Sequence, residues 1–135
     1  MLLNSIASST RIIARNSATR VCQRTFSAAT AMNAKKQFIL IARDYQDPDA
    51  PNRRATVRPK HLVGAKELKK SGMLQLGGAL LTNHSESGQM IGSVMIFNAD
   101  SEEEVIKAVE RDLYVTEKVW EHYQIMPFRQ AAFEP

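Results

Sequence analysis

The order of the secondary-structure patterns constrains the fold of this chain more than any other feature. Runs of strand length, apolar or partly alternating, predict four β-strands, at 37–43, 73–81, 90–98 and about 122–133. Helices are predicted at about 54–70 and from Ser101, where Glu104 three residues on completes a capping box. A short helical segment is expected at 115–120. The resulting order predicts an α+β fold, a ferredoxin-like βαββαβ sandwich in which two helices cover one face of an antiparallel sheet.

The other face of this predicted sheet has no cover within the chain. It also carries apolar side chains, because the predicted strands are apolar on both sides. A large uncovered apolar surface favours self-association. We therefore expect a homodimer in which two open sheet faces pack against each other.

Residues 1–31 differ in composition from the rest of the chain. The four arginines between positions 11 and 24 precede the first acidic residue, Asp44, and the segment is rich in Ser, Ala and Thr. This composition is typical of a mitochondrial presequence, although a disordered basic tail would share it. We expect a cleaved transit peptide at 1–31 and a single folded domain at 34–135 in the mitochondrial matrix.

Charge, cysteine content and hydropathy exclude several classes of protein. The net charge of +4 belongs to the leader and the remainder is nearly neutral, which argues against nucleic-acid binding. The single cysteine, Cys22, also lies in the leader, so that the domain is expected to lack disulfides and zinc–thiolate sites. The acids at 44–49 lack the glycine and distal glutamate of a calcium loop. No run approaches the roughly 20 apolar residues of a membrane span.

A histidine lies in the middle of the apolar side of the first predicted helix. At about 100° per residue, Val57, Gly64, Ala65 and Leu68 gather on one side, and His61 falls among them. A buried polar group without a partner costs roughly 1–3 kcal/mol. The pattern therefore predicts a polar partner for His61 from elsewhere in the chain.

Five short motifs together resemble the YCII-related family. They are FILIARD at 38–44, RPKHL at 58–62, LGGAL at 76–80, DLYV at 112–115 and MPFR at 126–129. The resemblance, which covers about 36–133, implies a ferredoxin-like fold, a dimeric α/β barrel and a cleft with a His–Asp pair. The family's R-P-x-H-L motif places the histidine at His61, and its D-P-Y-V motif places the aspartate at Asp112, with Leu113 instead of the usual proline. Characterised members resemble lyases or dehydrochlorinases of small aromatic or lactone compounds.

A carboxylate beside an imidazole fixes the tautomer and leaves the other ring nitrogen free for proton transfer near neutral pH. The main hypothesis is therefore a cofactor-free and metal-free lyase or isomerase, in which His61 is the acid/base and Asp112 orients it. Arg58, the backbone at Gly77 and Gly78, and His84 would bind a small cyclic or anionic substrate.

Each of these residues also has an alternative role. His61 could be a core histidine, Asp112 a helix N-cap, Arg58 a solvated helix residue and His84 a surface histidine. The pair of glycines could mark a β-bulge, or could meet only a packing or bend requirement of the strand. The alternative function is a non-catalytic dimeric module that binds a small molecule or a partner. A cofactor-free monooxygenase is a third hypothesis, since such enzymes occur among the related dimeric barrels.

Overall fold

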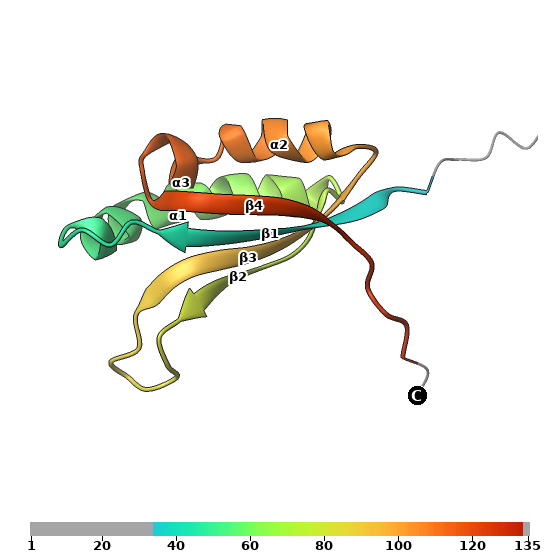
Figure 1. The fold of residues 1–135 in the computed structure, drawn as a ribbon. Coiled ribbons are helices and arrows are strands. Elements are labelled where there is room, and N and C mark those ends of the chain that lie inside the picture. Colours follow the sequence, from blue (N-terminus) through green and yellow to red (C-terminus); the bar gives the residue numbers. More distant parts are fainter. Residues whose placement is uncertain (1–33, 134–135) are drawn as a thin grey trace, which may run out of the picture. The chain divides into compact units, whose positions relative to one another are not determined.

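A computed structural model describes residues 34–133 and shows the expected order of strands and helices (Figure 1). The elements are β1 Lys36–Asp44, α1 Ala50–Lys70, β2 Leu74–Leu81, β3 Met90–Ala99, α2 Glu102–Glu110, α3 Leu113–Thr116 and β4 Trp120–Phe128. The transit peptide expected at 1–31, with Cys22, lies outside the described residues. Within those residues no helix is long and apolar enough to cross a membrane.

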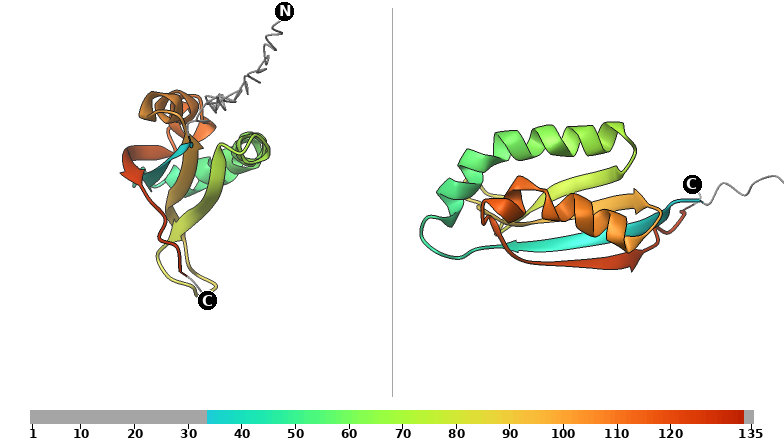
Figure 2. Two further views of the ribbon diagram at one scale, coloured as in Figure 1. Left: turned by 90° about the vertical axis from the view of Figure 1, so that its right-hand side faces the viewer. Right: turned by 90° about the horizontal axis from the view of Figure 1, so that it is seen from above.

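The four strands form one antiparallel sheet in the order β2-β3-β1-β4. Both longer helices lie on the same side of this sheet, which confirms the ferredoxin-like α+β fold (Figures 1 and 2). The two central strands, β1 and β3, pair from Lys36 opposite Ala99 to Arg43 opposite Gly92. Pro127 lies in β4, an edge strand, where a missing N–H costs least.

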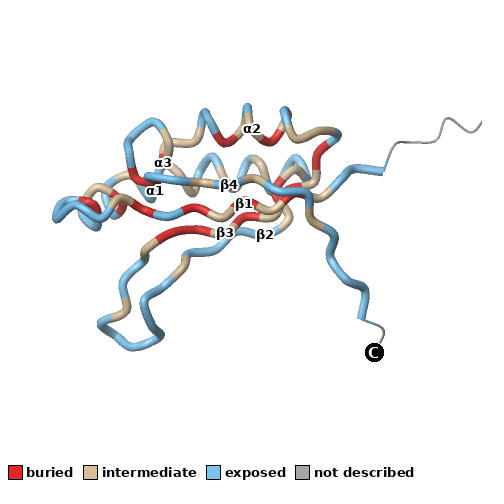
Figure 3. The backbone as a smooth tube through the Cα atoms, viewed as in Figure 1, coloured by how far each residue is buried: buried red, intermediate tan, exposed pale blue. Residues whose placement is uncertain are grey.

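The core lies between the sheet and the helices. Alternate residues of the central strands point toward the helices and are buried, which Figure 3 shows as red segments along β1 and β3. They pack with apolar side chains of α2, α3 and the adjoining segments. The members with the least exposure are Leu40, Ala42, Phe97, Ala99, Val105, Tyr114 and Val119. Burying a side chain the size of Val, Leu or Phe contributes about 1.5–3 kcal/mol, which holds both helices on this face.

Helix α1 begins at Ala50, four residues before the predicted start. Pro51 lies before the predicted start at about residue 54, but proline is tolerated in the first turn of a helix, where its missing N–H is not needed. Arg53 holds this turn, since its guanidinium donates to both carboxylate oxygens of Asp47 at 2.8 and 3.0 Å. Pro59 lies inside the helix, and Figure 2 shows α1 as bent, as expected for an interior proline.

The segment around α3 and β4 also differs from the prediction. The short helix spans Leu113–Thr116 rather than 115–120, and Lys118, with a φ of 54°, turns the chain into β4. The register shifts at the end of β1, so that Trp120 pairs with Asp44 and turns toward the core. Strand β4 ends at Phe128 instead of 133, because β1, its only neighbour in the sheet, begins at Lys36 and offers no further partner.

The sheet face away from the helices is apolar and partly exposed within one chain. We call it the outer sheet face. Its apolar residues come from all four strands, namely Ile39, Ile41, Leu76, Leu80, Val94, Ile96, Met126 and Phe128. Leu76 is 53% exposed and Met126 is 38% exposed.

Candidate functional site

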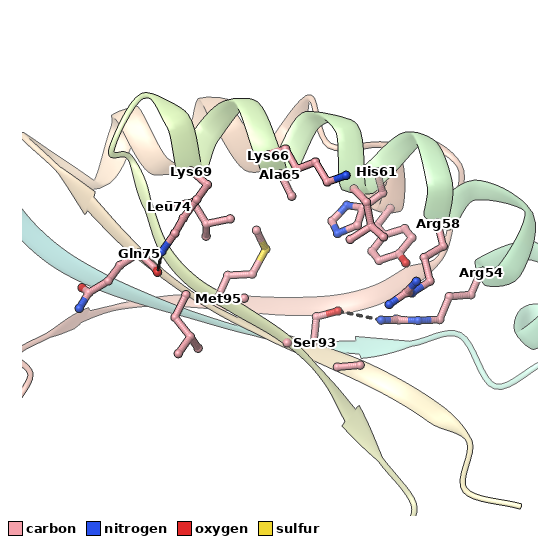
Figure 4. Close-up of a pocket in the computed structure, with 16 residues that line it drawn as sticks. Arg54, Arg58, His61, Ala65, Lys66, Lys69, Leu74, Gln75, Ser93 and Met95 are labelled. Atoms are coloured by element: carbon pink, nitrogen blue, oxygen red, sulfur yellow. Dashed lines mark hydrogen bonds between the residues drawn. The ribbon is translucent and has the colours of Figure 1, made fainter. Parts of the chain in front are cut away.

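A cavity of about 470 Å³ lies between α1 and the strands β2 and β3. Its floor comes from β2 and β3, and its roof from successive turns of α1 (Figure 4). The side chains of His61, Arg58 and Arg54 point from the helix toward the sheet, and Ser93 lies on the sheet beneath them. The cavity is therefore built by the packing of one helix over an edge strand and its neighbour.

His61 and Asp112 form a hydrogen-bonded pair at one end of this cavity. The distance from Nδ1 of His61 to Oδ1 of Asp112 is 2.7 Å, and the side chains are 9% and 11% exposed. Because a carboxylate oxygen accepts, Nδ1 carries the hydrogen, and Nε2 is the acceptor nitrogen of the neutral ring. His61 lines the cavity and Asp112 does not.

The same carboxylate oxygen also caps α3. Oδ1 of Asp112 accepts the backbone N–H of Tyr114 at 2.8 Å, with Asp112 in an extended conformation at the N-cap position. Asp112 therefore has both of the roles raised from the sequence, since it is the N-cap of α3 and the partner of His61. The cap fixes the carboxylate in the place from which it orients His61.

Aromatic stacking fixes the plane of the histidine ring. The ring of Tyr114 lies parallel to that of His61, with centroids 3.8 Å apart and planes 9° apart, and Trp120 meets His61 edge-on at 6.1 Å. Tyr114 also lines the cavity. Burial raises the pKa of the Tyr114 hydroxyl, which therefore stays protonated near neutral pH.

The lining of the cavity is cationic. It includes Arg54, Arg58, Lys66 and Lys69, and no Asp or Glu. The positive charge of Arg54 is balanced by the buried carboxylate of Asp44, whose oxygens lie 2.7 and 2.8 Å from the guanidinium. Burial raises the pKa of Asp44, and the neighbouring guanidinium opposes that rise.

The other three cations of the lining form no ion pair with a carboxylate of the described residues. Lys69 donates to the backbone carbonyl of Gln75, and Arg58 forms no ion pair within the described residues. The cavity thus favours an anionic or oxygen-rich ligand.

A second cavity of about 500 Å³ lies between α1 and α2, and both His61 and Asp112 line it. Within residues 34–133 no group of three or more His, Cys, Asp or Glu is placed to hold a metal ion.

Most of the site residues expected from the sequence meet in the first cavity. Arg58, Gly77 and Gly78 line it beside His61. The strand register shifts on either side of the two glycines and not at them, so they do not form the bulge raised as an alternative. His84 lies exposed in the 82–89 loop and is not among the lining residues, so a single chain does not bring it to the cavity.

Sequence reasoning missed three residues of this site. Arg54 lies one turn before Arg58, and that spacing on a helix could have placed both on one face. Ser93 lies within the strand predicted at 90–98 but was given no role. Tyr114 belongs to the DLYV motif but was given no role in the site.

Comparisons with known proteins agree with this fold. The YCII-related domain matches residues 37–129. Fusaric acid biosynthesis protein 2 of Gibberella moniliformis is 33% identical over 99 residues, which covers 70% of this chain and 93% of that protein. Protein YciI of Escherichia coli O6:H1 is 29% identical over 96 residues, covering 69% of this chain and 96% of that protein.

Solved structures also share this fold. One of them is the 5-chloro-2-hydroxyhydroquinone dehydrochlorinase of Burkholderia phenoliruptrix AC1100 in complex with 2,5-dihydroxybenzoquinone. The TM-score is 0.62 at 24% sequence identity, and the match covers 70% of this chain and 95% of that chain. At this identity the likeness supports the fold.

Proposed function

This chain belongs to the YCII-related domain family, and on that premise we propose that it is a small cofactor-free acid/base enzyme of the lyase or isomerase type. His61 is the acid/base and Asp112 orients it. The observation that carries the proposal is the 2.7 Å contact between these two side chains at the edge of a cavity lined by cations and by no carboxylate.

The proposed chemistry is proton transfer at a carbon next to a carbonyl group. Nε2 of His61 takes the proton, and the electron pair of the broken C–H bond moves into an enolate. In an isomerisation the proton returns to another carbon. In an elimination the enolate expels a leaving group from the neighbouring carbon, and that group departs with the electron pair of its bond. A positioned acid/base of this kind typically contributes about 10²–10⁴-fold in rate.

The cavity supports a small cyclic or anionic substrate. Its volume of about 470 Å³ falls within the usual range of small-molecule sites. Arg58 would hold an anionic group, and the backbone of Gly77 and Gly78 would lie along the ring. The name of the structural neighbour describes a dehydrochlorinase acting on a small oxygenated ring, which is compatible with such a substrate.

Hydrogen–deuterium exchange tests the proposal without knowledge of the natural substrate. A panel of cyclic ketones, lactones and hydroxyquinones is incubated with the full chain in D₂O, and exchange at carbon is followed by NMR. We expect catalysed exchange for some members and a loss of about 10²-fold or more in His61→Asn. His122→Asn is the matched control, because His122 is exposed and does not line the cavity. Equal exchange by His61→Asn and wild type would refute the assignment.

The burial of His61 favours the second function, a non-catalytic module that binds a small molecule. Its side chain is only 9% exposed, and both a hydrogen bond and a stacked ring restrain it. Such a module would bind members of the same panel in the cavity but would not catalyse exchange with any of them. The exchange experiment therefore separates the two functions.

We further propose a homodimer formed through the outer sheet face. The support is the exposed apolar surface described above, which a second copy of the same face would cover. Ile41→Lys puts a charge at the centre of that face and should shift the sedimentation coefficient to that of a monomer. Val63→Lys, at an exposed apolar position on α1, is the control. A dimer that persists in Ile41→Lys would exclude this interface.

Mitochondrial import also remains a proposal, supported by the composition of residues 1–31. Fusing residues 1–31 to a fluorescent protein tests it. We expect the fusion to reach mitochondria and a variant with the four leader arginines changed to glutamine to stay outside. Import of both fusions, or of neither, would contradict the proposal.

A further inference from the structure

Ser93 has two hydrogen-bond donors pointed at its hydroxyl oxygen. Nη2 of Arg54 donates to Oγ at 3.1 Å, and the indole Nε1 of Trp120 donates at 3.2 Å. Arginine and the tryptophan indole have no acceptor atom, so both contacts use lone pairs of the serine oxygen. The two acceptor positions of the hydroxyl are therefore filled.

The hydrogen of this hydroxyl is left without an acceptor. A serine hydroxyl has one hydrogen and two lone pairs, and within residues 34–133 Ser93 makes no contact in which it donates. Ser93 is 5% exposed, and an unused donor in a buried place is costly. The described residues supply no acceptor for the hydroxyl hydrogen of Ser93.

The surroundings of Ser93 direct this hydrogen to the first cavity. Ser93 lies on the helix-facing side of β3, where its cross-strand neighbours are Ala42 and Ala79. Neither alanine side chain can accept a hydrogen bond, and both are small. Ser93 itself lines the cavity under α1 (Figure 4).

Two further donors at this end of the cavity are also unused. Nε of Arg54 is a buried side-chain nitrogen without a partner, in a side chain that is 5% exposed. The hydroxyl of Tyr114 forms no hydrogen bond within the described residues, and the guanidinium of Arg54 lies 4.7 Å from the centre of its ring. Both residues line the cavity. Several donors thus gather beside His61, and no side-chain carboxylate in the lining accepts from them.

We propose that the hydroxyl of Ser93 donates to a carbonyl or enolate oxygen of the bound molecule, with Tyr114 as a second donor. The cavity would then take small molecules that carry such an oxygen at the end nearest His61. This inference rests on the proposed function, because it names the group that holds the reacting oxygen.

The proposed contact strengthens as the reaction proceeds. When Nε2 of His61 removes a proton from carbon, the electron pair moves through the carbonyl group and negative charge develops on its oxygen. Hydrogen-bond donors fixed at that oxygen stabilise the developing charge more than they stabilise the neutral carbonyl. Ser93 keeps its own proton throughout, so the proton balance involves only the substrate and His61.

Binding of two matched probes tests the inference independently of turnover. 4-Nitrophenolate and 4-nitrothiophenolate are similar in shape and charge when both are ionised, but sulfur is the poorer hydrogen-bond acceptor. We expect the full-length wild type to prefer the phenolate, and Ser93→Ala to narrow that preference about tenfold, as for loss of one hydrogen bond to a charged oxygen. Ser93→Thr retains a hydroxyl and should keep the preference.

Trp120→Phe is the structural control. It removes one of the two donors to Ser93 but leaves the hydroxyl in place, so it should lower the stability and keep the phenolate preference. An equal narrowing in Trp120→Phe and Ser93→Ala would overturn the inference, as would an unchanged preference in Ser93→Ala. Wild-type protein that shows no preference, or binds neither probe, would overturn it as well.

A structure of the wild type with bound 4-nitrophenolate gives a test that does not depend on a folded variant. The phenolate oxygen should lie within hydrogen-bond distance of Oγ of Ser93, and any other placement of that oxygen refutes the proposal. Absence of carbon-bound hydrogen exchange together with the expected probe preference would reject the catalytic function and retain the binding contact.

Discussion

Asp112 uses one carboxylate oxygen for two contacts, one with His61 and one with the backbone of Tyr114. A comparison of three substitutions tests whether this oxygen is shared. Asp112→Ala removes both the cap of α3 and the partner of His61. Loss of a cap costs about 1 kcal/mol, and leaving the Nδ1 hydrogen of His61 unpaired costs about 1–3 kcal/mol. We expect Asp112→Ala to lower the free energy of unfolding by about 2–4 kcal/mol in total.

Asp112→Asn should cost much less. The side-chain amide oxygen can still accept from the backbone of Tyr114 and from Nδ1 of His61, so that the loss is confined to the charge on the acceptor. Charged hydrogen bonds are roughly twice as strong as neutral ones, which gives a cost of about 1 kcal/mol. Urea unfolding followed by circular dichroism measures these differences, with unchanged slopes showing that the variants unfold in the same way.

Ser101→Ala provides the matched control for the cap alone. Ser101 caps α2 through the backbone N–H of Glu104 at 3.4 Å and has no histidine partner. Its loss should cost about 1 kcal/mol or less. The excess cost of Asp112→Ala over Ser101→Ala then measures the contact with His61. Equal costs for Asp112→Ala and Asp112→Asn, or no excess over Ser101→Ala, would refute the shared-oxygen geometry.

Three further predictions concern other parts of the molecule. The hydrogen bond from Arg53 lowers the pKa of Asp47 to about 2. The contribution of ionised Asp47 to the free energy of unfolding is therefore present above the ordinary pKa of about 3.8 and is lost as the pH falls toward 2. Urea midpoints measured over this window should fall less in Asp47→Asn than in wild type. Gly92→Ala should lower the free energy of unfolding by more than about 2 kcal/mol, because the added carbon would lie 2.2 Å from a carbonyl oxygen of β1. Gly77→Ala, whose added carbon would have its nearest contacts at 3.8 Å, should change the urea midpoint little. Arg58→Gln should weaken binding of anionic probes and reduce its salt dependence without loss of stability, because this exposed residue forms no ion pair in the described chain.

The sequence predicted the order of strands and helices along the chain, because hydrophobic periodicity depends only on residues close together in the sequence. The His61–Asp112 pair spans 51 positions, and its prediction came from the motifs shared with the family. Local patterns say which face a residue occupies, whereas partners on different elements depend on how those elements pack.

The buried ion pair of Arg54 and Asp44 was not predicted from the sequence. The predicted strand ended at residue 43 and left out Asp44, although the alternation of Phe38, Leu40 and Ala42 continues to this position and predicts an inward-facing side chain. Its burial becomes understandable only once α1 brings Arg54 over the end of the strand. Because an isolated buried carboxylate is unfavourable, burial of Asp44 is not expected without a cationic partner, and the local sequence does not show that Arg54 is this partner.

The position after Asp112 allows the helix start itself to be tested. Leu113 stands where the family has proline, and it is the first residue of α3, the helical position that proline favours. Asp112, with φ −66° and ψ 136°, already has the extended conformation required before proline. Leu113→Pro and Leu113→Ala lose the same leucine contacts, so their difference isolates the backbone.

We expect the proline variant to be more stable than the alanine variant by about 0.4–1 kcal/mol, because proline restricts the unfolded chain. The same urea titrations measure this difference. If Leu113 lay within the helix instead, proline would cost about 3 kcal/mol relative to alanine. A result of that sign would mean that α3 begins before Asp112, and the carboxylate could not then act as its cap while holding His61.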